Sequence, residues 1–403
     1  MTAVMQGVRV LEVAEHTFVP AASALLADLG AEVVKIEHAE RGDAMRGLAS
    51  SGTVSFGGGV HVLLEHSNRG KQSLGLDLTA PEGLDVLYKV AATCDVFLTN
   101  KLPSIRTKLK IDVDDMRAHN PGLIYVRGHG QGDKGPEADR GSYDMLSYWC
   151  RAGVAMGAKQ YDNVPPPPAP AFGDSIGAMT IAGAIMGALF HRERTGEATE
   201  VDVSLLGTGL WSMGAAMALS LQLETPWLAP APDGPKGNPL VATYLTQDER
   251  FVSLCCLQAG KYWPEACKVI GRPELAEDER FADPLNLMAN AAEACDLVAA
   301  AFRERTLAEW REALADFSGQ WAVVQDTLEA ASDPQTIANG YIGDCATADG
   351  TPFQLVTSPM QFGGQPHAPK RAPEFNEHGD EILESIGLDM DAILDLKIRG
   401  VVA

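Results

Sequence analysis

A single carboxylate, Asp174, lies between a proline-rich stretch at 165–170 and a run without charged residues at 175–190. An aspartate ahead of a helix commonly caps it, because its side chain accepts hydrogen bonds from the first free N–H groups. A carboxylate can also act as a nucleophile or as a general acid or base. The residues alone leave both roles open for Asp174, capping and chemistry.

Strands that alternate with helices precede this residue and would have to position it. Apolar runs predict strands at 8–14, 32–37, 72–78, 96–100 and 123–130. Thr79 with Glu82 predicts a capping box for the helix that follows the third strand. Such alternation is typical of a parallel sheet covered on both faces, so we expect an α/β fold with a Rossmann-like sheet. The turn after the first strand lacks the G-x-G-x-x-G fingerprint, which disfavours an NAD-dependent oxidoreductase.

The composition changes after Leu223. A connector rich in Pro and Gly at 224–239 precedes a predicted hairpin at 242–257 and helices near 261–270, 287–304 and 307–317. Thr306 with Glu309 predicts a capping box for the last of these helices. We therefore expect a large Rossmann-like domain at 1–222, a smaller α+β domain at 223–330, and a return segment at 331–403 that packs on the large domain.

Bulk composition limits the classes of function. The formal net charge of −22, from 54 acidic and 32 basic residues, excludes broad non-specific binding to nucleic acid. The seven cysteines show neither CxxC nor Cys/His metal spacing, so we expect reduced thiols and no metal site. No cationic segment followed by an apolar one stands at the N-terminus, and we expect no signal peptide and a cytoplasmic protein.

The stretch 203–223 carries no charged residue and is long enough to span a membrane. Gly, Ser, Thr and Gln occur throughout it, and nothing else in the chain favours a membrane protein. We expect a helix buried between subunits or domains.

Five segments together resemble the class III CoA-transferases: GVRVLEVAEHTFVPAASALLADLGAEVVKIE, NRGKQSLGLDL, GHGQGDKGPEADRGSYDML, GDSIGAM and RAPEFNEHGDEIL. That family includes formyl-CoA:oxalate and carnitine-pathway CoA-transferases and also α-methylacyl-CoA racemases. The likeness covers nearly the whole chain in the family's order. It implies an interlocked homodimer, in which each chain threads through a ring formed by the other. The 203–223 stretch would then be buried interface, and Gly183 and Gly187 would allow close helix approach.

Asp174 matches the nucleophile of this family, the aspartate of a Gly-Asp pair ahead of the same helix. The resemblance implies that it forms a mixed anhydride with the acyl group and then an aspartyl-CoA thioester. CoA would thereby pass from an acyl-CoA to a small carboxylic acid. Coenzyme A and acyl-CoA are then substrates, and no tightly bound cofactor is expected. Backbone N–H groups at 173–175 are candidate oxyanion donors, and Gly173 would let a bulky acyl-CoA approach.

The family places CoA contacts after the first strand, after KIE, near NRGK and after the strand that ends in TN. The corresponding residues are His16, Thr17, Phe18, His38, Asn68, Lys71, Asn100, Lys108 and Leu109. Basic side chains among them would pair with phosphates. Several relatives carry Arg where this chain has His38, a weaker phosphate ligand at neutral pH, and Arg41 or Arg46 could compensate.

Tyr143 and Asp144 separate two branches of the family. In the racemases a histidine precedes this aspartate and moves the α-proton, whereas a tyrosine is a poor general base at neutral pH. Tyr143 and Asp144 are therefore expected in an acyl pocket, which a loop at 234–239 with Gly237 would cover.

An acyl-CoA racemase or epimerase and a CoA-binding protein without transfer activity are the alternatives. His129 and His191 are expected to be structural.

Overall fold

The computed structural model describes residues 3–50, 59–159, 163–228, 234 and 236–403. The chain divides into two units. The first comprises Met1–Ala229 together with Gln335–Ala403, and the second comprises Pro230–Pro334. Each unit has a hydrophobic core of its own.

A six-stranded parallel sheet forms the centre of the first unit. In the order of the chain, its strands are β1 (Arg9–Val13), β2 (Glu32–Glu37), β3 (Gln72–Gly75), β4 (Val96–Thr99), β5 (Ile124–His129) and β6 (Glu200–Ser204). They lie in the order β3-β2-β1-β4-β5-β6, and every neighbouring pair is parallel. This is the doubly wound order, whose direction reverses between β1 and β4. The expected parallel sheet is confirmed, and β6 is a sixth strand that we did not predict.

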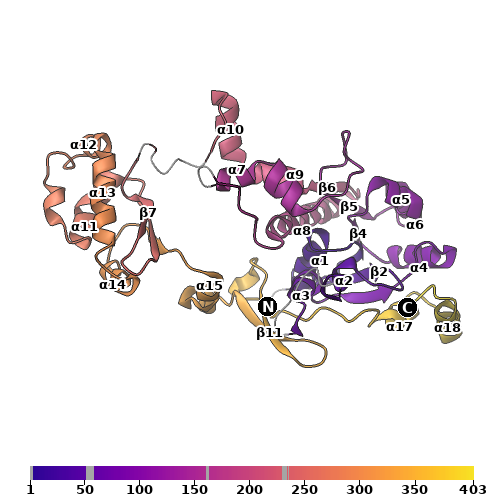
Figure 1. Ribbon diagram of the computed structural model, residues 1–403. Helices are drawn as coiled ribbons and strands as arrows, with labels where there is room; N and C mark the ends of the chain where they lie inside the picture. Colours follow the sequence, from indigo (N-terminus) through magenta and orange to yellow (C-terminus); the bar gives the residue numbers. More distant parts are fainter. Residues whose placement is uncertain (1–2, 51–58, 160–162, 229–233, 235) are drawn as a thin grey trace. The chain divides into compact units, whose positions relative to one another are not determined.

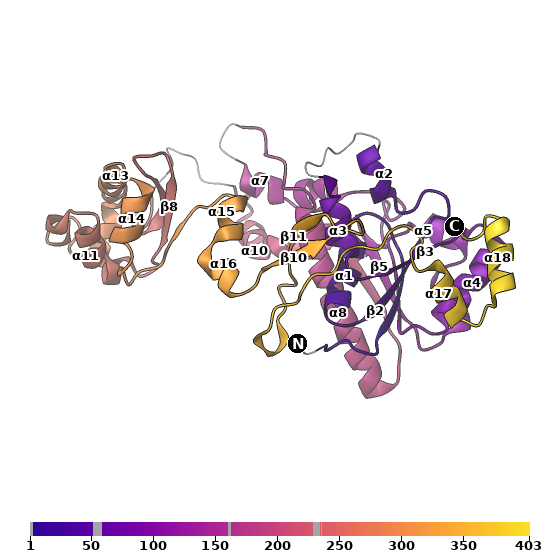
Figure 2. The same ribbon diagram turned by 90° about the horizontal axis from the view of Figure 1, so that it is seen from below.

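Helices cover both faces of this sheet, and Figure 2 shows α1 and α8 on one side and α4, α17 and α18 on the other. Alternate strand residues explain the two layers, because Val10 faces one core cluster and its neighbour Leu11 faces the other. The helices with the first cluster are α1 (Phe18–Asp28) and α8 (Phe172–Thr195). Those with the second are α4 (Pro81–Ala91), α6 (Val113–His119), α17 (Gly379–Ser385) and α18 (Met390–Ile398).

Shorter helices fill the connections of the first unit. They are α2 (Ala44–Ser50), α3 (Val62–Asn68), α5 (Pro103–Leu109), the π-helix η2 (Met145–Arg151), α7 (Val154–Ala158), α9 (Leu205–Ser212), α10 (Gly214–Leu223) and α16 (Pro334–Ala338). A small hairpin, β10 (Ile342–Ala346) with β11 (Pro352–Val356), opens the return segment. Figure 1 shows this segment, in yellow, running back beside the N-terminal elements to α17 and α18.

The capping box expected at Thr79 is wrong. The N–H and O–H of Thr79 both donate to Asp77 Oδ1, at 2.8 and 2.7 Å, so its hydroxyl is not available to α4. Ala80 is the N-cap residue, and Pro81 begins the helix without needing an N–H partner.

The single helix expected at 203–223 is also wrong. Val203 and Ser204 belong to β6, and the Ser204 hydroxyl accepts the Gly207 N–H at 2.9 Å and caps α9. The helical part is then interrupted at Met213, where α9 ends and α10 begins. Within the described part of the chain, α8 is the helix whose length and apolar composition would suffice to cross a membrane. Seven of its residues, from Gly173 to Ala188, are buried in the core that α8 shares with α1 and the sheet.

The second unit combines a three-stranded antiparallel sheet with helices. β7 (Val241–Leu245), β8 (Phe251–Cys255) and β9 (Trp321–Val323) pair in that order, and the predicted hairpin is confirmed. The helices are α11 (Ala259–Val269), the 3-10 helix η3 (Pro273–Ala276), α12 (Pro284–Ala289), α13 (Ala291–Phe302), α14 (Leu307–Ala313) and α15 (Thr327–Ser332). The capping box of Thr306 and Glu309 is present as expected. The predicted helix 287–304 divides at Asn290, whose amide donates to the carbonyls of Asn286 and Arg280.

Candidate active site

Asp174 lies in the first turn of α8 and does not cap it. The N-cap residue is Ala171, which has a left-handed conformation with φ of 57°. The carbonyl of Ala171 accepts the first intrahelical bond, from the Ser175 N–H at 2.9 Å. The capping role that the sequence left open for Asp174 is therefore wrong.

The half-buried carboxylate of Asp174 has no hydrogen bond or ion pair to any of the described residues. Burial raises its pKa to about 7, and the negative charge of Asp144 contributes to the same shift. An anion that is neither solvated fully nor paired is a reactive nucleophile, and a strongly shifted pKa is typical of functional groups. Asp174 thus has the environment of a reacting group.

Asp144 connects two segments beside the nucleophile. Its Oδ2 accepts the Gly173 N–H at 3.2 Å, while its Oδ1 accepts the Met145 N–H at 2.7 Å at the start of η2. A β-carbon at Gly173 would lie 2.5 Å from Cγ of Tyr148, which is buried in η2. The packing of Tyr148 therefore requires a glycine at this position, and the approach of acyl-CoA that we expected Gly173 to allow stays a prediction.

The candidate oxyanion donors at 173–175 are mostly occupied. The Gly173 N–H donates to Asp144, and the Ser175 N–H donates to the carbonyl of Ala171. The N–H of Asp174 itself has no acceptor among the residues that the structure describes. Of the three amides expected, that of Asp174 alone is available to a ligand.

A cavity of about 450 Å³ opens beside Asp174 at the carboxyl ends of the central strands. Glu15 and His16 follow β1, Asn100 and Lys101 follow β4, and His129 ends β5. The direction of the sheet reverses between β1 and β4, and ligands of doubly wound sheets bind in the crevice at that point. The topology therefore explains why these loops meet at Asp174.

Four predicted binding residues line the cavity with the nucleophile: His16, Phe18, Asn100 and Tyr143. His16 has a positive φ of 68° and donates its N–H to Asp43 Oδ1 at 3.0 Å, and its ring makes a T-shaped contact with the ring of Tyr143. Tyr143 is 62% exposed, so its ring stands in solvent at the cavity rim.

Phe18 and Asn100 shape the cavity walls. Phe18 fits against two glycines, since a β-carbon at Gly128 or Gly177 would approach its ring to 3.1 or 2.3 Å. Asn100 joins the loops after β1 and β4, because its amide donates to the carbonyl of Glu15 at 2.7 Å and accepts the Glu15 N–H at 3.2 Å.

Lys71, Asn68 and Thr17 are buried and do not line this cavity. The Lys71 ammonium donates to Glu12 Oε2 and the Pro20 carbonyl, each at 2.8 Å, and to Asn68 Oδ1 at 3.0 Å. These three bonds use all the hydrogens of the ammonium group. Lys71 and Asn68 thus belong to an ionic network beneath α1, and a phosphate contact by Lys71 would require it to break these bonds.

The remaining predicted residues also lie outside the cavity lining. His38 and Lys108 are exposed, and Leu109 packs against the second core cluster. Gly237 is an exposed residue of the second unit. Their roles towards CoA and the acyl group stay predictions.

Arg41, which the sequence offered as a substitute for His38, lines the cavity together with two cationic residues that were not predicted, Lys101 and Arg140. Lys101 pairs with Glu15, and Arg140 pairs with Glu137 at 2.8 Å. Arg41 is exposed and makes no ion pair within the described residues. Arg46, the other candidate to compensate for His38, is held by both oxygens of Glu37 at 2.7 and 2.8 Å. Arg41 is therefore the cation that remains available.

His129 lines the cavity beside two carboxylates, at 3.2 Å from Asp202 and 3.6 Å from Asp133. Together these three side chains could offer ligand atoms to a metal ion. Arg127 already pairs with Asp202 at 2.7 Å, and an adjacent guanidinium opposes a cation there. The partners of His129 agree with the structural role expected for it.

Comparisons with known proteins agree with this arrangement. The chain is 29% identical over 403 residues to the (R)-2-hydroxy-4-methylpentanoate CoA-transferase of Clostridioides difficile, covering 99% of each chain. It is 27% identical to the cinnamoyl-CoA:phenyllactate CoA-transferase of Clostridium sporogenes, covering 98% of this chain and 96% of the other.

Solved structures and a family profile extend the likeness. A CAIB/BAIF family protein from Brucella suis has a TM-score of 0.80 at 25% identity, covering 96% of this chain and 100% of the other. Rv3272 from Mycobacterium tuberculosis has a TM-score of 0.78 at 26% identity, covering 94% of this chain and 98% of the other. The sequence profile of CoA-transferase family III matches residues 5–379. The chain therefore belongs to CoA-transferase family III and is a CoA-transferase.

Proposed function

We propose that the protein moves CoA between an acyl-CoA thioester and a free carboxylic acid, with Asp174 as the covalent nucleophile. One observation carries the proposal above all. Asp174 is a half-buried carboxylate without a partner among the described residues, and it lines the cavity at the reversal point of the sheet. A structural aspartate in that position would be expected to have a hydrogen-bond donor.

The reaction follows from the chemistry of a carboxylate. An oxygen of Asp174 attacks the thioester carbonyl, the C–S bond breaks, and CoA leaves as a thiolate. The thiolate then attacks the aspartyl carbonyl of the mixed anhydride, which releases the first acid as a carboxylate and leaves CoA on Asp174 as a thioester. The acceptor acid repeats these steps in reverse. Both intermediates keep the carbonyl of Asp174 activated, first as an anhydride and then as a thioester, so the exchange is balanced without another reactant.

The charge of Asp144 favours the covalent steps. Asp144 and the ionised Asp174 repel each other, as the raised pKa of Asp174 reflects. An anhydride or a thioester at Asp174 is uncharged, so its formation removes the repulsion. Asp144 thereby raises the free energy of the ionised resting state relative to the intermediates.

The cavity supplies the contacts for CoA in this proposal. A polyanion needs local cations in a protein whose net charge is −22, and Arg41 stands unpaired at the cavity. His16, Phe18 and Asn100 would contact the remainder of CoA, and Tyr143 would contact the acyl group. Relatives act on hydroxy and aryl acids, by their names, which supports a small carboxylic acid as the acceptor here.

The homodimer and the cytoplasmic location are part of the same proposal. Gly183 and Gly187 have open space around the position of a β-carbon, so a second chain could approach α8 closely. Trp211 of α9 and Leu221 of α10 are 87% and 75% exposed, which is unusual for large apolar side chains on a free surface. The cysteines of the chain are free thiols, which supports a reducing compartment.

Exchange kinetics test the transferase assignment. Purified protein should transfer CoA between acyl-CoA and acid pairs with ping-pong kinetics, and Asp174→Ala should lower the rate by about 10³-fold or more. Asp391→Asn is the matched control, because Asp391 is an exposed acid in the first turn of α18. Full exchange activity in Asp174→Ala would refute the proposal. Acyl-CoA binding without exchange for any acid would favour the non-catalytic alternative.

A further inference from the structure

A second cavity, of about 480 Å³, lies at the amino ends of β2 and β3, at the opposite end of the strands from Asp174. Its floor comes from the loop after α1 and from Gly70 and Gln72, and its outer wall comes from the return segment at 370–378. This volume lies in the range of small-molecule sites. None of its lining residues takes part in the Asp174 cavity.

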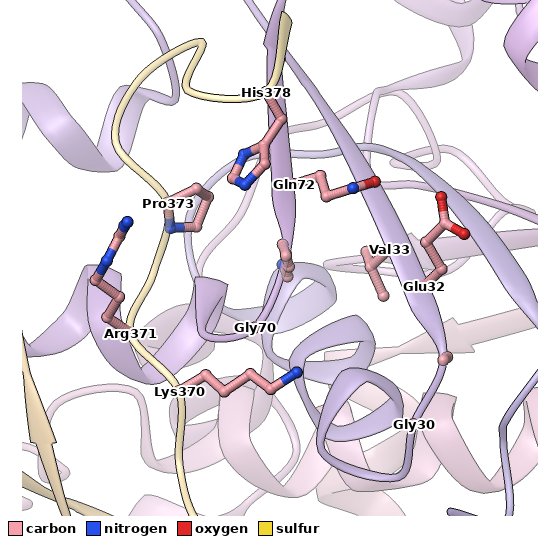
Figure 3. A pocket seen from close by; sticks show the side chains of 11 residues that line it. Gly30, Glu32, Val33, Gly70, Gln72, Lys370, Arg371, Pro373 and His378 are labelled. Carbon is pink, nitrogen blue, oxygen red and sulfur yellow. The ribbon is translucent and has the colours of Figure 1, made fainter. Parts of the chain in front are cut away.

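The return segment forms this cavity by attaching to the edge strand β3 and to the loop before it. The Gly70 N–H donates to the carbonyl of Arg371 at 3.0 Å, and the His378 N–H donates to the carbonyl of Ser73 at 3.1 Å. Between these attachments Pro373 lines the space, and Asn376 contacts the strand again, where its Oδ1 accepts the Gly75 N–H at 2.9 Å and its N–H donates to Ser73 Oγ at 3.0 Å. Figure 3 shows the segment as the curved outer wall.

Lys370 supplies a positive charge that no described residue neutralises. Its aliphatic part lies along Gly70, where a β-carbon would be 3.7 Å from Lys370 Cδ. Figure 3 shows the ammonium extending across the pocket, whereas the guanidinium of Arg371 turns away and pairs with Glu377. In a chain of net charge −22, an unpaired lysine that lines a cavity favours an anion there.

His378 adds a donor whose direction is set by the backbone. Its Nδ1 accepts the Ser73 N–H at 3.3 Å, so the neutral ring carries its proton on Nε2. The ring hangs into the pocket in Figure 3, and its Nε2 has no partner in the described part of the chain. Lys370 and His378 therefore place two unpaired donors in the lining of this cavity.

Gln72, in contrast to Lys370 and His378, offers a hydrogen-bond acceptor. Its Oε1 is buried and has no hydrogen-bond partner, which is costly for an amide oxygen. Glu32, another lining residue, is a carboxylate that pairs with Arg9 at 2.9 Å. A ligand of this cavity would thus have to donate a hydrogen bond as well as carry negative charge. Sulfate has no proton at neutral pH, whereas a phosphate group keeps one in part of its population.

From these contacts we propose that the cavity at the amino ends of β2 and β3 binds a protonated phosphate group, held by Lys370 and His378 and donating to Gln72. The group comes from inorganic phosphate or from a small phosphate monoester. The proposal does not depend on the reaction at Asp174, because the two cavities share no residue.

Calorimetric titration of the full-length protein tests the site without turnover. We expect inorganic phosphate or glycerol 3-phosphate to bind with a Kd of about 1 mM or lower, and sulfate at least about tenfold more weakly. The two phosphate arms distinguish the free ion from an ester. Absence of binding by both, or equal binding of sulfate, would overturn the proposal.

Two variants assign the binding to these residues. Lys370→Met should weaken phosphate binding about tenfold, while Lys89→Met, which removes an exposed lysine of α4, should leave it unchanged. Gln72→Leu should reduce the preference for phosphate over sulfate. Equal affinities in the two lysine variants, or an undiminished preference in Gln72→Leu, would contradict the assignment. A thermal melt checks that each variant is folded.

Discussion

Asp144 Oδ2 accepts the backbone N–H of Gly173, the residue directly before Asp174, at 3.2 Å. The same carboxylate therefore fixes the start of α8 and places a negative charge near the nucleophile. Burial and this charge together raise the pKa of Asp174 to about 7. Asp144 thus contributes both to the position of the nucleophile and, after burial, to the rise of its pKa.

The rate of CoA transfer should depend on pH through Asp174. The nucleophile must be ionised, so the rate should fall as the pH drops below about 7. Asp144→Asn removes a charge that raises the pKa, and the acid limb should move to lower pH, with a several-fold higher relative rate at pH 6. Initial rates between pH 5 and pH 9 measure this. An unchanged midpoint would show that Asp144 does not influence the nucleophile electrostatically.

Comparison of Asp144→Ala with Asp144→Asn separates the positioning role of Asp144 from the effect of its charge. It removes the hydrogen bonds to Gly173 and Met145 together with the charge, whereas the amide of Asp144→Asn can still accept one of them. We expect kcat of the alanine variant to fall at every pH, on the order of tenfold or more, because the start of α8 loses its anchor. Equal kcat values for both variants at high pH would contradict the positioning role.

Replacement of the nucleophile should stabilise the fold. Burial penalises the charged form of Asp174, so the penalty is absent below the ordinary pKa of 3.8, grows as the pH rises, and is complete above about 7. After allowance for its partial exposure, Asp174→Asn should be about 1–2 kcal/mol more stable than the wild type at pH 8. The difference should vanish near pH 4. Denaturant unfolding at both values checks this, and a less stable variant at pH 8 would contradict it.

Gly173→Ala should impair catalysis through packing. The new β-carbon would lie 2.5 Å from Tyr148 Cγ, so either the ring or the start of α8 has to move. We expect a loss of stability of about 1–3 kcal/mol and a fall in kcat on the order of 10²-fold. Denaturant unfolding and initial rates measure the two effects. A Gly173→Ala variant with the stability and kcat of the wild type would contradict the packing role of this glycine.

Arg41→Ala should raise KM for acyl-CoA about tenfold with little effect on kcat, because it removes an unpaired cation of the cavity. Lys108→Ala is a matched comparison, since Lys108 is an exposed cation that does not line the cavity. We expect the larger rise in KM for acyl-CoA from Arg41→Ala. A larger effect at Lys108 would show that CoA follows a path outside this cavity.

The buried strands were predictable from the sequence because their composition is decisive. β1 and β2 are apolar runs enclosed between two helical layers, and the predicted range of β2 agrees with the observed one. β6 was missed because it is the edge strand and only partly buried, so its residues EVDVS carry a weak apolar signal. The prediction of one helix at 203–223 was wrong for a related reason. It rested on the absence of charged residues, which does not distinguish the end of a buried strand from a helix.

The site was predictable in part. Asp174, His16 and Asn100 follow from the resemblance, and they meet in one cavity. The contacts of Lys71 could not be predicted from the sequence. A lysine next to a strand has the same local sequence pattern whether it binds phosphate or, as here, the buried Glu12. Lys101 and Arg140 lie in separate loops, and only the folding of the sheet brings them to one cavity. No local pattern carries that information.

Trapping the acyl-enzyme tests the central claim most directly. Hydroxylamine added during turnover should attack the carbonyl of the anhydride or thioester and leave a hydroxamate on the peptide that contains Asp174. Mass spectrometry should find this modification only when acyl-CoA is present, and without exchange of the substrate α-hydrogen in heavy water. Rapid α-hydrogen exchange with no hydroxamate on that peptide would contradict the covalent role of Asp174 and would favour a racemase.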